Sequence, residues 1–562
     1  MTSVVAAAGV FLLATLAPFE TTAPILRLPW QAISNLEAVL ALSLMAWLGA
    51  LVWSRRAPSW RTRLAWSGVA FVGAMAVAAA AAPADRTNAW HMTGRLAAAG
   101  AVFLLTVNGV TNRARLRAAL ALSVGSGVVV AALAMLEYFQ VEPVLRALRL
   151  FRPSVTSVGA QIRAGGPLQY PTIASMYLEI VFAFGLGLML AAVDVASRAR
   201  AALWFLALLA IGAAITLTFT RAGLVTMAAI LGLVGVLRLR ERGVEAGTLL
   251  TATLAVAIAI VFMSSRSAQS LWLRLTSESQ EAWYRARVDA PAVVSMATGR
   301  PQYIDVSATN AGRVVWDSGG DAPIYLSYHW MVEGGSSVVA YEGERTAFSA
   351  PVEPGSTTRV RALVIPPRQP GIYSLVWDLV QEDRLWFSTE PAAPASAVSR
   401  ATVTGVGTGG PLIAVDPPRR AVRPGRVVLW RAAGRIFAAH PLLGVGPDNF
   451  RLLYGSYTGL QGADPRTHSN NMYLEVLAGG GLLGAAAFLW LLREAVSTFI
   501  TICKGSDPGH VAVAMAGGAI ALHATVDSFL SFAPTYVLFA LTLGFAAAIA
   551  RGMEHAADAH RV

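Results

Sequence analysis

Two polar stretches near the end of the sequence contain residue types that could carry out chemistry. They are HPLLGVGPDNF at 440–450 and THSNNMYLEV at 467–476, and the second runs directly into a glycine-rich apolar segment. We therefore expect His468 to precede a helix whose N-cap is Ser469 or Asn470. A histidine near its ordinary pKa can serve as a general base at neutral pH, and the free N–H groups of a helix N-terminus bind anions. Gly444 and Gly446 are predicted to be turn glycines, and the adjoining Asp448 and Asn449 to be local caps.

Two arginines in other parts of the chain could bind phosphate. Arg163 begins the stretch RAGGPL at 163–168, and Arg221 lies in TFTRAG at 218–223, between two apolar runs. Arginine stays charged at any relevant pH and binds phosphate oxygens in pairs. Together with His468, these residues suggest a site for a phosphorylated ligand.

The elements that must position these residues are membrane helices. Of the 562 residues, 55% are hydrophobic and only 14% are charged, whereas a soluble domain carries nearer a quarter charged residues. The net charge of +12 comes almost entirely from arginine in short loops between apolar runs. That distribution follows the positive-inside rule and does not predict a nucleic-acid groove. The lone Cys503 excludes an intrachain disulfide and is expected to be inert.

The apolar runs predict an α-helical polytopic membrane protein with about 12 transmembrane helices. The first run is expected to be a retained helix, because no basic segment precedes it. The runs lie at 4–19, 36–53, 64–82, 95–110, 116–138, 172–193, 200–219, 222–237, 247–264, 473–493, 511–529 and 533–551.

Alternate loops carry the arginines, which predicts that both termini are cytoplasmic. These residues are Arg55, Arg56, Arg61, Arg63, Arg113, Arg115, Arg117, Arg198, Arg200, Arg238, Arg240 and Arg242. The remaining loops, which hold Arg163, Arg221 and His468, then face the periplasm.

The long segment 265–472 changes from helical to alternating periodicity. The runs 324–330 and 373–379 have the alternation of strands, and turn signals such as 353–355 separate them. We predict an inserted periplasmic Ig-like β-sandwich at 293–406. The other predicted parts are helices 1–9 at 1–264, a linker or helix at 265–292, a loop with an amphipathic helix at 407–472, and helices 10–12 at 473–562. Arg431 and Arg435 lie one turn apart on that amphipathic helix.

These four motifs, taken in their order along the chain (163–168, 218–223, 440–450 and 467–476), resemble the signature of the O-antigen ligase and O-antigen polymerase family. The resemblance covers the membrane portion, most strongly 160–225 and 425–485. Thr220 stands where serine is commoner in the family, Ser469 separates His468 from the asparagines, and the β-module is an insertion that family members often lack. None of these departures removes a candidate catalytic group, but the insertion leaves the acceptor open.

The resemblance implies a glycosyltransferase that takes a glycan from a polyprenyl (undecaprenyl) diphosphate donor in the bacterial inner membrane. Arg163, Arg221, Arg431 and Asn470 would bind the diphosphate, and Arg221 would stabilise the charge that develops on it. His468 would either deprotonate the acceptor or bind the diphosphate. Since neither a nucleotide loop nor a carboxylate cluster is evident on that face, we predict a metal-independent reaction without cofactors.

Plainer explanations exist for each candidate. Arg221 could be an interfacial arginine with no ligand, although its place in a non-cytoplasmic loop runs against the charge rule. Arg163 shares its loop with other arginines that are merely solvated, and Arg431 could be a membrane-surface anchor. Tyr325, Trp330, Trp377 and Trp386 could stack on sugars, but alternating aromatics in a sandwich more often form its core.

Alternative functions differ in the acceptor or in the whole mechanism. A ligase would transfer the glycan to an acceptor such as lipid A-core, and a polymerase would extend a lipid-linked repeat. A polysaccharide exporter would place charged residues near the middle of the membrane, whereas here they collect at one interface. A sugar sensor would need fewer helices as an anchor. The sequence favours the ligase.

Overall fold

The computed structural model describes most of the chain, with gaps in several loops. The described residues are 1–27, 32–60, 62–152, 156–158, 161–265, 283–319, 323–334, 338–341, 343–381, 385–389, 396–405, 426–458, 465–505 and 507–559. The expected linker or helix at 265–292 and the start of the segment 407–472 fall largely outside these residues.

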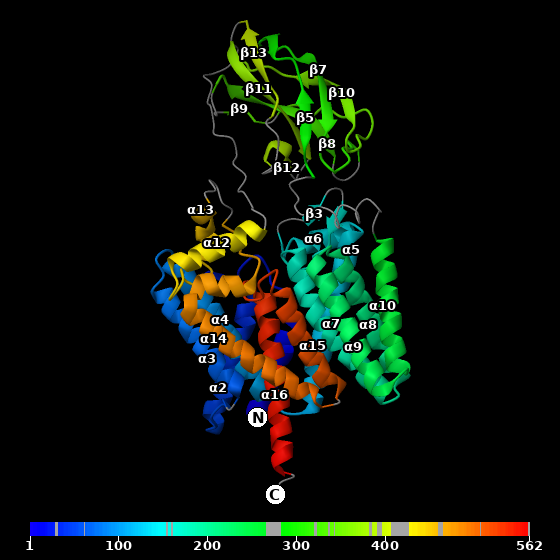
Figure 1. Ribbon diagram of the computed structural model, residues 1–562, viewed down its shortest axis with the longest axis vertical. Helices are drawn as coiled ribbons and strands as arrows, with labels where there is room; N and C mark the ends of the chain where they lie inside the picture. The colour runs from blue at the N-terminus through cyan, green and yellow to red at the C-terminus, as the bar shows by residue number, and fades with distance from the viewer. Residues whose placement is uncertain are drawn as a thin grey trace.

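Long apolar helices make up the part of the molecule drawn below the sheets in Figure 1. They are α1 (Thr2–Leu16), α2 (Asn35–Ser54), α3 (Arg63–Ala80), α4 (Arg86–Gly109), α5 (Arg113–Tyr138), α7 (Pro171–Asp194), α8 (Arg198–Leu217), α9 (Arg221–Arg242), α10 (Ala246–Ser264), α14 (Met472–Cys503), α15 (Pro508–His523) and α16 (Ala533–Ala559). Each of the twelve expected apolar runs falls on one of them. Within the described residues, nine helices are long and apolar enough to cross a membrane, so the chain is a polytopic α-helical membrane protein.

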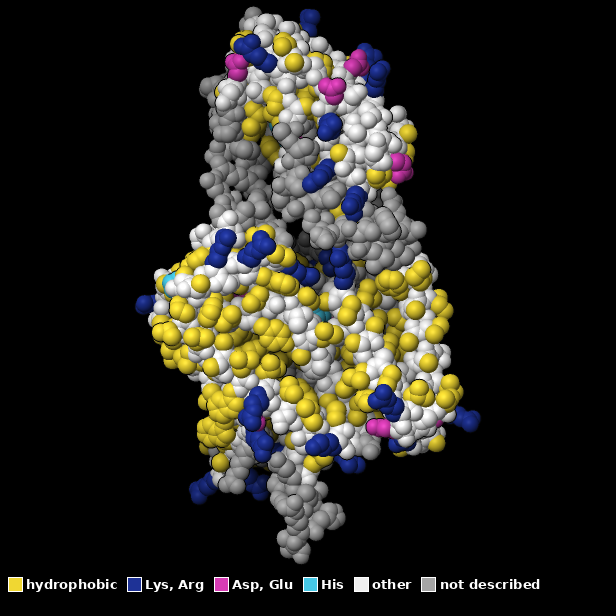
Figure 2. All heavy atoms as spheres, in the orientation of Figure 1, with side chains coloured by type: hydrophobic (Ala, Val, Ile, Leu, Met, Phe, Trp, Pro, Cys, Tyr) yellow, Lys and Arg dark blue, Asp and Glu magenta, His cyan; other side chains and the backbone are white. Residues whose placement is uncertain are grey.

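The arginine-rich loops gather at the end of the helices that holds the N-terminus, away from the sheets (Figure 1). Arg115 donates to the carbonyl of Ser3 at 3.1 Å, and Arg551 donates to the Ser59 hydroxyl at 2.9 Å. Figure 2 shows a band of hydrophobic side chains around the helices, with arginines above and below it. This is the distribution that a bilayer requires.

The inserted module consists of two sheets that share one core. Its strands are β5 (Ala286–Asp289), β6 (Val293–Ala297), β7 (Gln302–Asn310), β8 (Ile324–Val332), β9 (Val338–Ala340), β10 (Thr357–Val364), β11 (Gly371–Gln381), β12 (Leu385–Trp386) and β13 (Val398–Thr404). One sheet has the order β10-β7-β5, and the other has the order β6-β13-β11-β8-β9 with β12 on β11. The strands expected at 324–330 and 373–379 are β8 and β11. The module begins at β5, before the expected boundary at 293.

Two of the four aromatic residues considered for sugar stacking belong to this shared core. Trp330 and Trp377 are 2% and 1% exposed and pack among residues of both sheets. Tyr325 and Trp386 are half-buried. The core explanation therefore holds for the two buried tryptophans.

Short elements complete the loops at the β-module end of the helices. They are α6 (Glu142–Leu148), α12 (Arg426–Ala439), α13 (Phe450–Thr458) and the small pairs β1 (Leu26–Arg27) with β2 (Ala32–Ile33) and β3 (Thr156–Val158) with β4 (Gln161–Arg163). Helix α12, the predicted amphipathic helix that carries Arg431 and Arg435, buries Leu429 and Ile436 against Phe450 and Tyr454. In Figure 1 it lies across the end of the bundle.

Helix α14 is broken at Gly481, where φ is 57° and ψ is −155°. The turn at 440–449 docks against this break and satisfies the backbone groups that the break exposes, as buried non-helical backbone in a membrane protein requires. The bonds run from Val445 N–H to Ala478 O (3.0 Å), Gly446 N–H to Gly479 O (2.9 Å), Leu482 N–H to Pro441 O (2.8 Å) and Leu483 N–H to Leu442 O (3.1 Å).

Glycine is required on both sides of this contact. Gly444, Gly446 and Gly481 have φ values of 66°, 94° and 57°, in the region that side chains disfavour. A Cβ atom on Gly444 would lie 2.5 Å from the carbonyl oxygen of Ala478, and one on Gly481 would lie 2.5 Å from the carbonyl carbon of Leu442. The two motifs found in the sequence therefore interlock through their backbones.

We expect Gly481→Ala to destabilise the protein. The conformation of Gly481, with φ of 57° and ψ of −155°, is essentially confined to glycine and costs another residue about 1–3 kcal/mol, and the alanine Cβ would in addition meet the Leu442 backbone. The measurement is the midpoint of thermal unfolding in detergent. Gly434→Ala is the matched control, because Gly434 lies inside α12 with open space around a Cβ, so its midpoint should stay unchanged or rise. Equal midpoints for the two variants would contradict the interlock.

Candidate functional site

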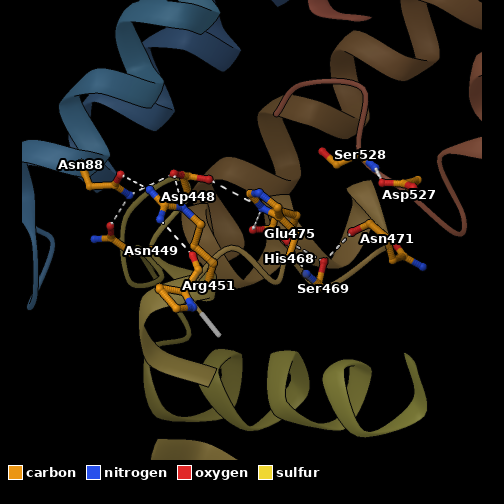
Figure 3. Close-up of polar contacts among 11 residues, drawn as sticks. Asn88, Asp448, Asn449, Arg451, His468, Ser469, Asn471, Glu475, Asp527 and Ser528 are labelled. Atoms are coloured by element: carbon orange, nitrogen blue, oxygen red, sulfur yellow. Dashed lines mark hydrogen bonds and ion pairs between the residues drawn. The ribbon is translucent and has the colours of Figure 1, made fainter. Parts of the chain in front are cut away.

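The docked turn presents Asp448 and Asn449 to the start of α4. Asn88 donates to Asp448 Oδ2 at 3.1 Å and to Asn449 Oδ1 at 3.0 Å, and Arg451 Nε donates to Asp448 Oδ2 at 2.8 Å. Asn449 is fully buried and donates to the carbonyl of Asp85 at 3.2 Å. These two residues were predicted to be local caps, but their contacts join segments far apart in the sequence (Figure 3).

His468 lies between two carboxylates. Its Nδ1 atom is 3.6 Å from Asp448 Oδ1 and 3.6 Å from Glu475 Oε1. The other Glu475 oxygen accepts hydrogen bonds from the backbone N–H and the hydroxyl of Ser469, at 2.9 and 2.6 Å. Because both acids have further partners, the imidazole faces a fixed pair of negative charges (Figure 3).

These charges change the protonation of His468. Burial of the ring disfavours its charged form, and Arg451 opposes that form as well. The nearby Glu475 and Asp448 carboxylates outweigh both effects, so the pKa of His468 is raised above its ordinary value. His468 is therefore a stronger base than a free histidine.

The N-cap of α14 is Asn471, and the prediction of Ser469 or Asn470 was wrong. The Asn471 side chain accepts from Leu474 N–H at 3.0 Å and donates to the Thr525 carbonyl at 2.9 Å. The Ser469 hydroxyl is already used by Glu475, and Asn470 adopts a left-handed turn with φ of 52°. Asn470, a predicted donor ligand, is half-buried between His468 and the cap.

Arg163 and Arg221 meet at the turn between α8 and α9. Arg163 donates through Nε to the Thr218 carbonyl at 3.0 Å and through a terminal nitrogen to the Thr220 hydroxyl at 3.3 Å. Thr220 is the residue before Arg221, the exposed first residue of α9. The structure thus brings these two predicted residues together.

A buried acid holds the loop that follows Arg163. Glu137 Oε2 accepts from the N–H groups of Gly165 and Gly166, at 3.0 and 2.8 Å, and the same carboxylate forms an ion pair with buried Arg152. Gly165 also has no room for a side chain, because a Cβ there would lie 2.9 Å from an Arg152 nitrogen. Arg152 is thus a buried residue with a structural partner, although the arginines that share this loop with Arg163 were expected to be solvated.

Aromatic rings extend from the end of the Arg163 loop to His468. Tyr170 ends the loop that starts at Arg163, and its ring centroid is 6.3 Å from that of Phe532. The Phe532 ring is 6.1 Å from the His468 imidazole. Two ring contacts therefore separate the start of α7 from His468.

Arg431 lies on the exposed face of α12. Its neighbour Arg435 donates to the Tyr457 carbonyl at 2.8 Å. Among the described residues, no contact joins Arg431 to His468 or to Arg221, so its predicted part in donor binding stays a prediction.

Asp448, His468 and Glu475 could also hold a metal ion, since their ligand atoms lie within 4.8 Å of one another. Oxygen and imidazole ligands of this kind suit several divalent cations. The premise that this face carries no carboxylate cluster was therefore wrong. Glu475 was not among the residues predicted from the sequence, although an acidic residue in the first turn of the helix after His468 was a usable signal. The position of Asp448 beside His468 could be seen only in the structure, because the docked turn brings it there.

One comparison with known proteins identifies a family. A family model described as O-antigen ligase matches residues 399–489, a range that contains the docked turn, His468 and Glu475. The match excludes Arg163 and Arg221. No curated protein matches the chain. The match at 399–489 supports assignment of the chain to the O-antigen ligase and polymerase family.

Proposed function

We propose that the protein transfers a glycan from a polyprenyl (undecaprenyl) diphosphate donor to an acceptor such as lipid A-core, at the periplasmic face of the bacterial inner membrane. The observation that carries this proposal is His468 flanked by two carboxylates within the segment that the O-antigen ligase family model matches. Nδ1 of His468 lies 3.6 Å from Asp448 and 3.6 Å from Glu475. Arg163 lies separately, against the turn that ends at Arg221.

The arginine turn would bind the donor. Guanidinium groups bind diphosphate oxygens in pairs and neutralise the charge that develops as diphosphate leaves. The hydrogen bonds from Arg163 to Thr218 and Thr220 fix that side chain beside the start of α9, where helix N–H groups also favour an anion. Asn470 and Arg431 are proposed as outer contacts of the same headgroup.

His468 would act as the general base, in preference to binding diphosphate. Two carboxylates 3.6 Å from Nδ1 stabilise the imidazolium that proton transfer creates, and they outweigh the opposing charge of Arg451. Nε2 would take the proton of the acceptor hydroxyl as its oxygen bonds to the anomeric carbon. The bond from that carbon to the phosphate oxygen breaks, and polyprenyl diphosphate leaves with the electron pair.

The proposed reaction needs no metal or other cofactor. The arginines supply the positive charge that a divalent cation gives to other phosphate-binding sites. The Asp448–His468–Glu475 group offers the one competing arrangement found among the described residues, which makes a chelator a necessary arm of any assay.

We expect His468→Ala and Arg221→Ala to lose transfer of sugar from polyprenyl diphosphate glycan to lipid A-core. Loss of a general base lowers the rate about 10²–10⁴-fold, and loss of a charge-stabilising group lowers it about 10²–10³-fold. The measurement is product formation by purified protein, with and without chelator. His91→Ala and Arg149→Ala are matched controls, because both side chains are exposed, His91 in α4 and Arg149 directly after α6. Parental rates in both site variants, or loss of activity with chelator, would contradict the mechanism.

The pH profile distinguishes the two roles of His468. A base must be neutral to accept a proton, so kcat/KM should rise with pH through a His468 pKa above its usual value near 6.5. Asp448→Asn removes one negative charge and should shift that limb to lower pH. If His468 instead bound diphosphate as a cation, kcat/KM would fall as the pH rose through the same pKa.

The membrane orientation can be tested with a periplasmic phosphatase reporter. Fusion after residue 405, in the β-module, should give an active reporter, because both termini are proposed to be cytoplasmic. Fusion after residue 196, in the loop between α7 and α8, should give an inactive one. The reverse pattern would place His468 in the cytoplasm and refute the proposed site.

A further inference from the structure

An apolar cavity of about 490 Å³ lies between α3, α4, α14 and α16. Its walls carry hydrophobic side chains from all four helices, among them Phe71, Phe103, Leu491 and Leu543. Val69, which also lines it, is 50% exposed on the outer surface of the helices. The cavity therefore opens sideways, toward the hydrocarbon of the bilayer.

The cavity occupies the half of the helices that adjoins the arginine-rich loops. Its lining on α3 runs from Leu64, the residue after the first residue of the helix, to Gly73. On α4 the lining ends at Leu104, close to the end of that helix at Gly109. The α3 lining rises roughly 14 Å, about half of the ~30 Å hydrocarbon core. In the proposed orientation, this half lies in the cytoplasmic leaflet.

A half-buried cation lies at the end of the cavity next to those loops. Arg551 of α16 donates to the Ser59 hydroxyl at 2.9 Å and to the Val107 carbonyl at 2.6 Å. Ser59 directly precedes Trp60, and Val107 lies three residues beyond Leu104. Trp60 and Leu104 both line the cavity, so the guanidinium lies beside its cytoplasmic end.

The charge of Arg551 has no acidic partner within the described residues. Both of its hydrogen bonds go to uncharged oxygens, whereas Arg238 and Arg113, at the same end, pair with Asp194 and Asp507. A guanidinium has five N–H donors, and these two contacts leave three for an oxyanion. A partly buried cation without a counter-ion is costly, so Arg551 calls for an anion from outside the chain.

We propose that this cavity binds an acyl chain of an anionic phospholipid, such as phosphatidylglycerol, with the lipid phosphate against Arg551. The inference goes beyond the proposed function and does not depend on it. The apolar walls fit the chain, and the guanidinium fits the phosphate oxygens. Trp60, which is 44% exposed at the same end, has the interfacial position that tryptophan favours in membrane proteins.

The charge at the end of the cavity selects among phospholipids. Phosphatidylethanolamine carries an ammonium group that already compensates its own phosphate, so it gains less from Arg551. Phosphatidylglycerol has a net negative charge, which the guanidinium of Arg551 neutralises. The cavity walls would hold the chain of either lipid, and Arg551 would supply the preference for the anionic one.

The test is native mass spectrometry of the full-length protein in detergent, titrated with phosphatidylglycerol or with phosphatidylethanolamine. In the parent protein we expect phosphatidylglycerol to bind about fivefold more tightly, the factor that one arginine adds at an anionic membrane surface. Arg551→Gln should lower the affinity for phosphatidylglycerol to that for phosphatidylethanolamine. Gly68 and Gly100 line the cavity, and a Cβ on either would meet open space. Gly68→Trp and Gly100→Trp should therefore fill it and weaken binding of both lipids at least tenfold.

Two residues of α9 provide matched controls. Arg240 is exposed near the same end of the helices, and Gly232 is exposed with open space around a Cβ. Arg240→Gln and Gly232→Trp should leave both lipid affinities unchanged. Equal affinities in the parent protein, or a parental preference in Arg551→Gln, would overturn the inference. A dimer that forms only when phosphatidylglycerol is absent would assign the cavity to a second copy of the chain and overturn it as well.

A direct measurement covers the case in which the tryptophan variants fail to fold. Phosphatidylglycerol carrying a photoreactive diazirine in an acyl chain should label peptides of α3 or α4 in the parent protein. Excess unmodified phosphatidylglycerol should abolish this labelling, and phosphatidylethanolamine should compete about fivefold less well. Labelling that both lipids remove equally well would mean bulk lipid only and would overturn the proposal.

Discussion

The backbone contact between the 440–449 turn and the break at Gly481 is the constraint that creates the candidate site. The backbone groups of α14 around Gly481 cannot all form helical hydrogen bonds. The turn instead donates to the carbonyls of Ala478 and Gly479 and accepts from the N–H groups of Leu482 and Leu483. Unpaired backbone groups cost several kcal/mol each in a bilayer, so the break and the turn stabilise each other. Asp448 belongs to the docked turn and Glu475 precedes the break in α14, and both acids lie beside His468.

Buried ion pairs keep the two parts of the site in register. Glu137 and Arg152 hold the loop that carries Arg163. His523, the last residue of α15, lies with its Nδ1 atom 2.7 Å from Glu179 Oε1 of α7, and both side chains are almost completely buried. Thr525, two residues after the end of α15, accepts a hydrogen bond from the Asn471 side chain. The His523–Glu179 pair thus links α7, which follows the Arg163 loop, to the segment that contacts the start of α14. Ionisable groups inside a membrane protein persist where a partner compensates their desolvation.

The helices were predictable because periodicity and apolar length are local properties. All twelve expected runs fall on helices, and the strands β8 and β11 appeared from alternation alone. The boundaries were less predictable: α4 begins at Arg86, well before the expected 95, because polar residues such as Asn88 serve tertiary contacts. His468 and the arginines could be found from residue type and motif. Glu475 could have been placed near His468 from its position in the first turn of the following helix. Asp448 could not, because its approach depends on a contact between glycines whose φ values no local pattern specifies.

The separation of charge within the site follows from the same geometry. A diphosphate leaving group needs positive charge, whereas a base that must bind a proton gains from negative charge. If both groups occupied one cluster, the arginines would lower the pKa of His468 and the acids would repel the donor. One cation, Arg451, does stand beside His468 and opposes its charged form, but the Glu475 and Asp448 carboxylates outweigh it. In the proposed mechanism the carboxylates would thus keep His468 basic enough to deprotonate an alcohol, and separate arginines would neutralise the anionic donor.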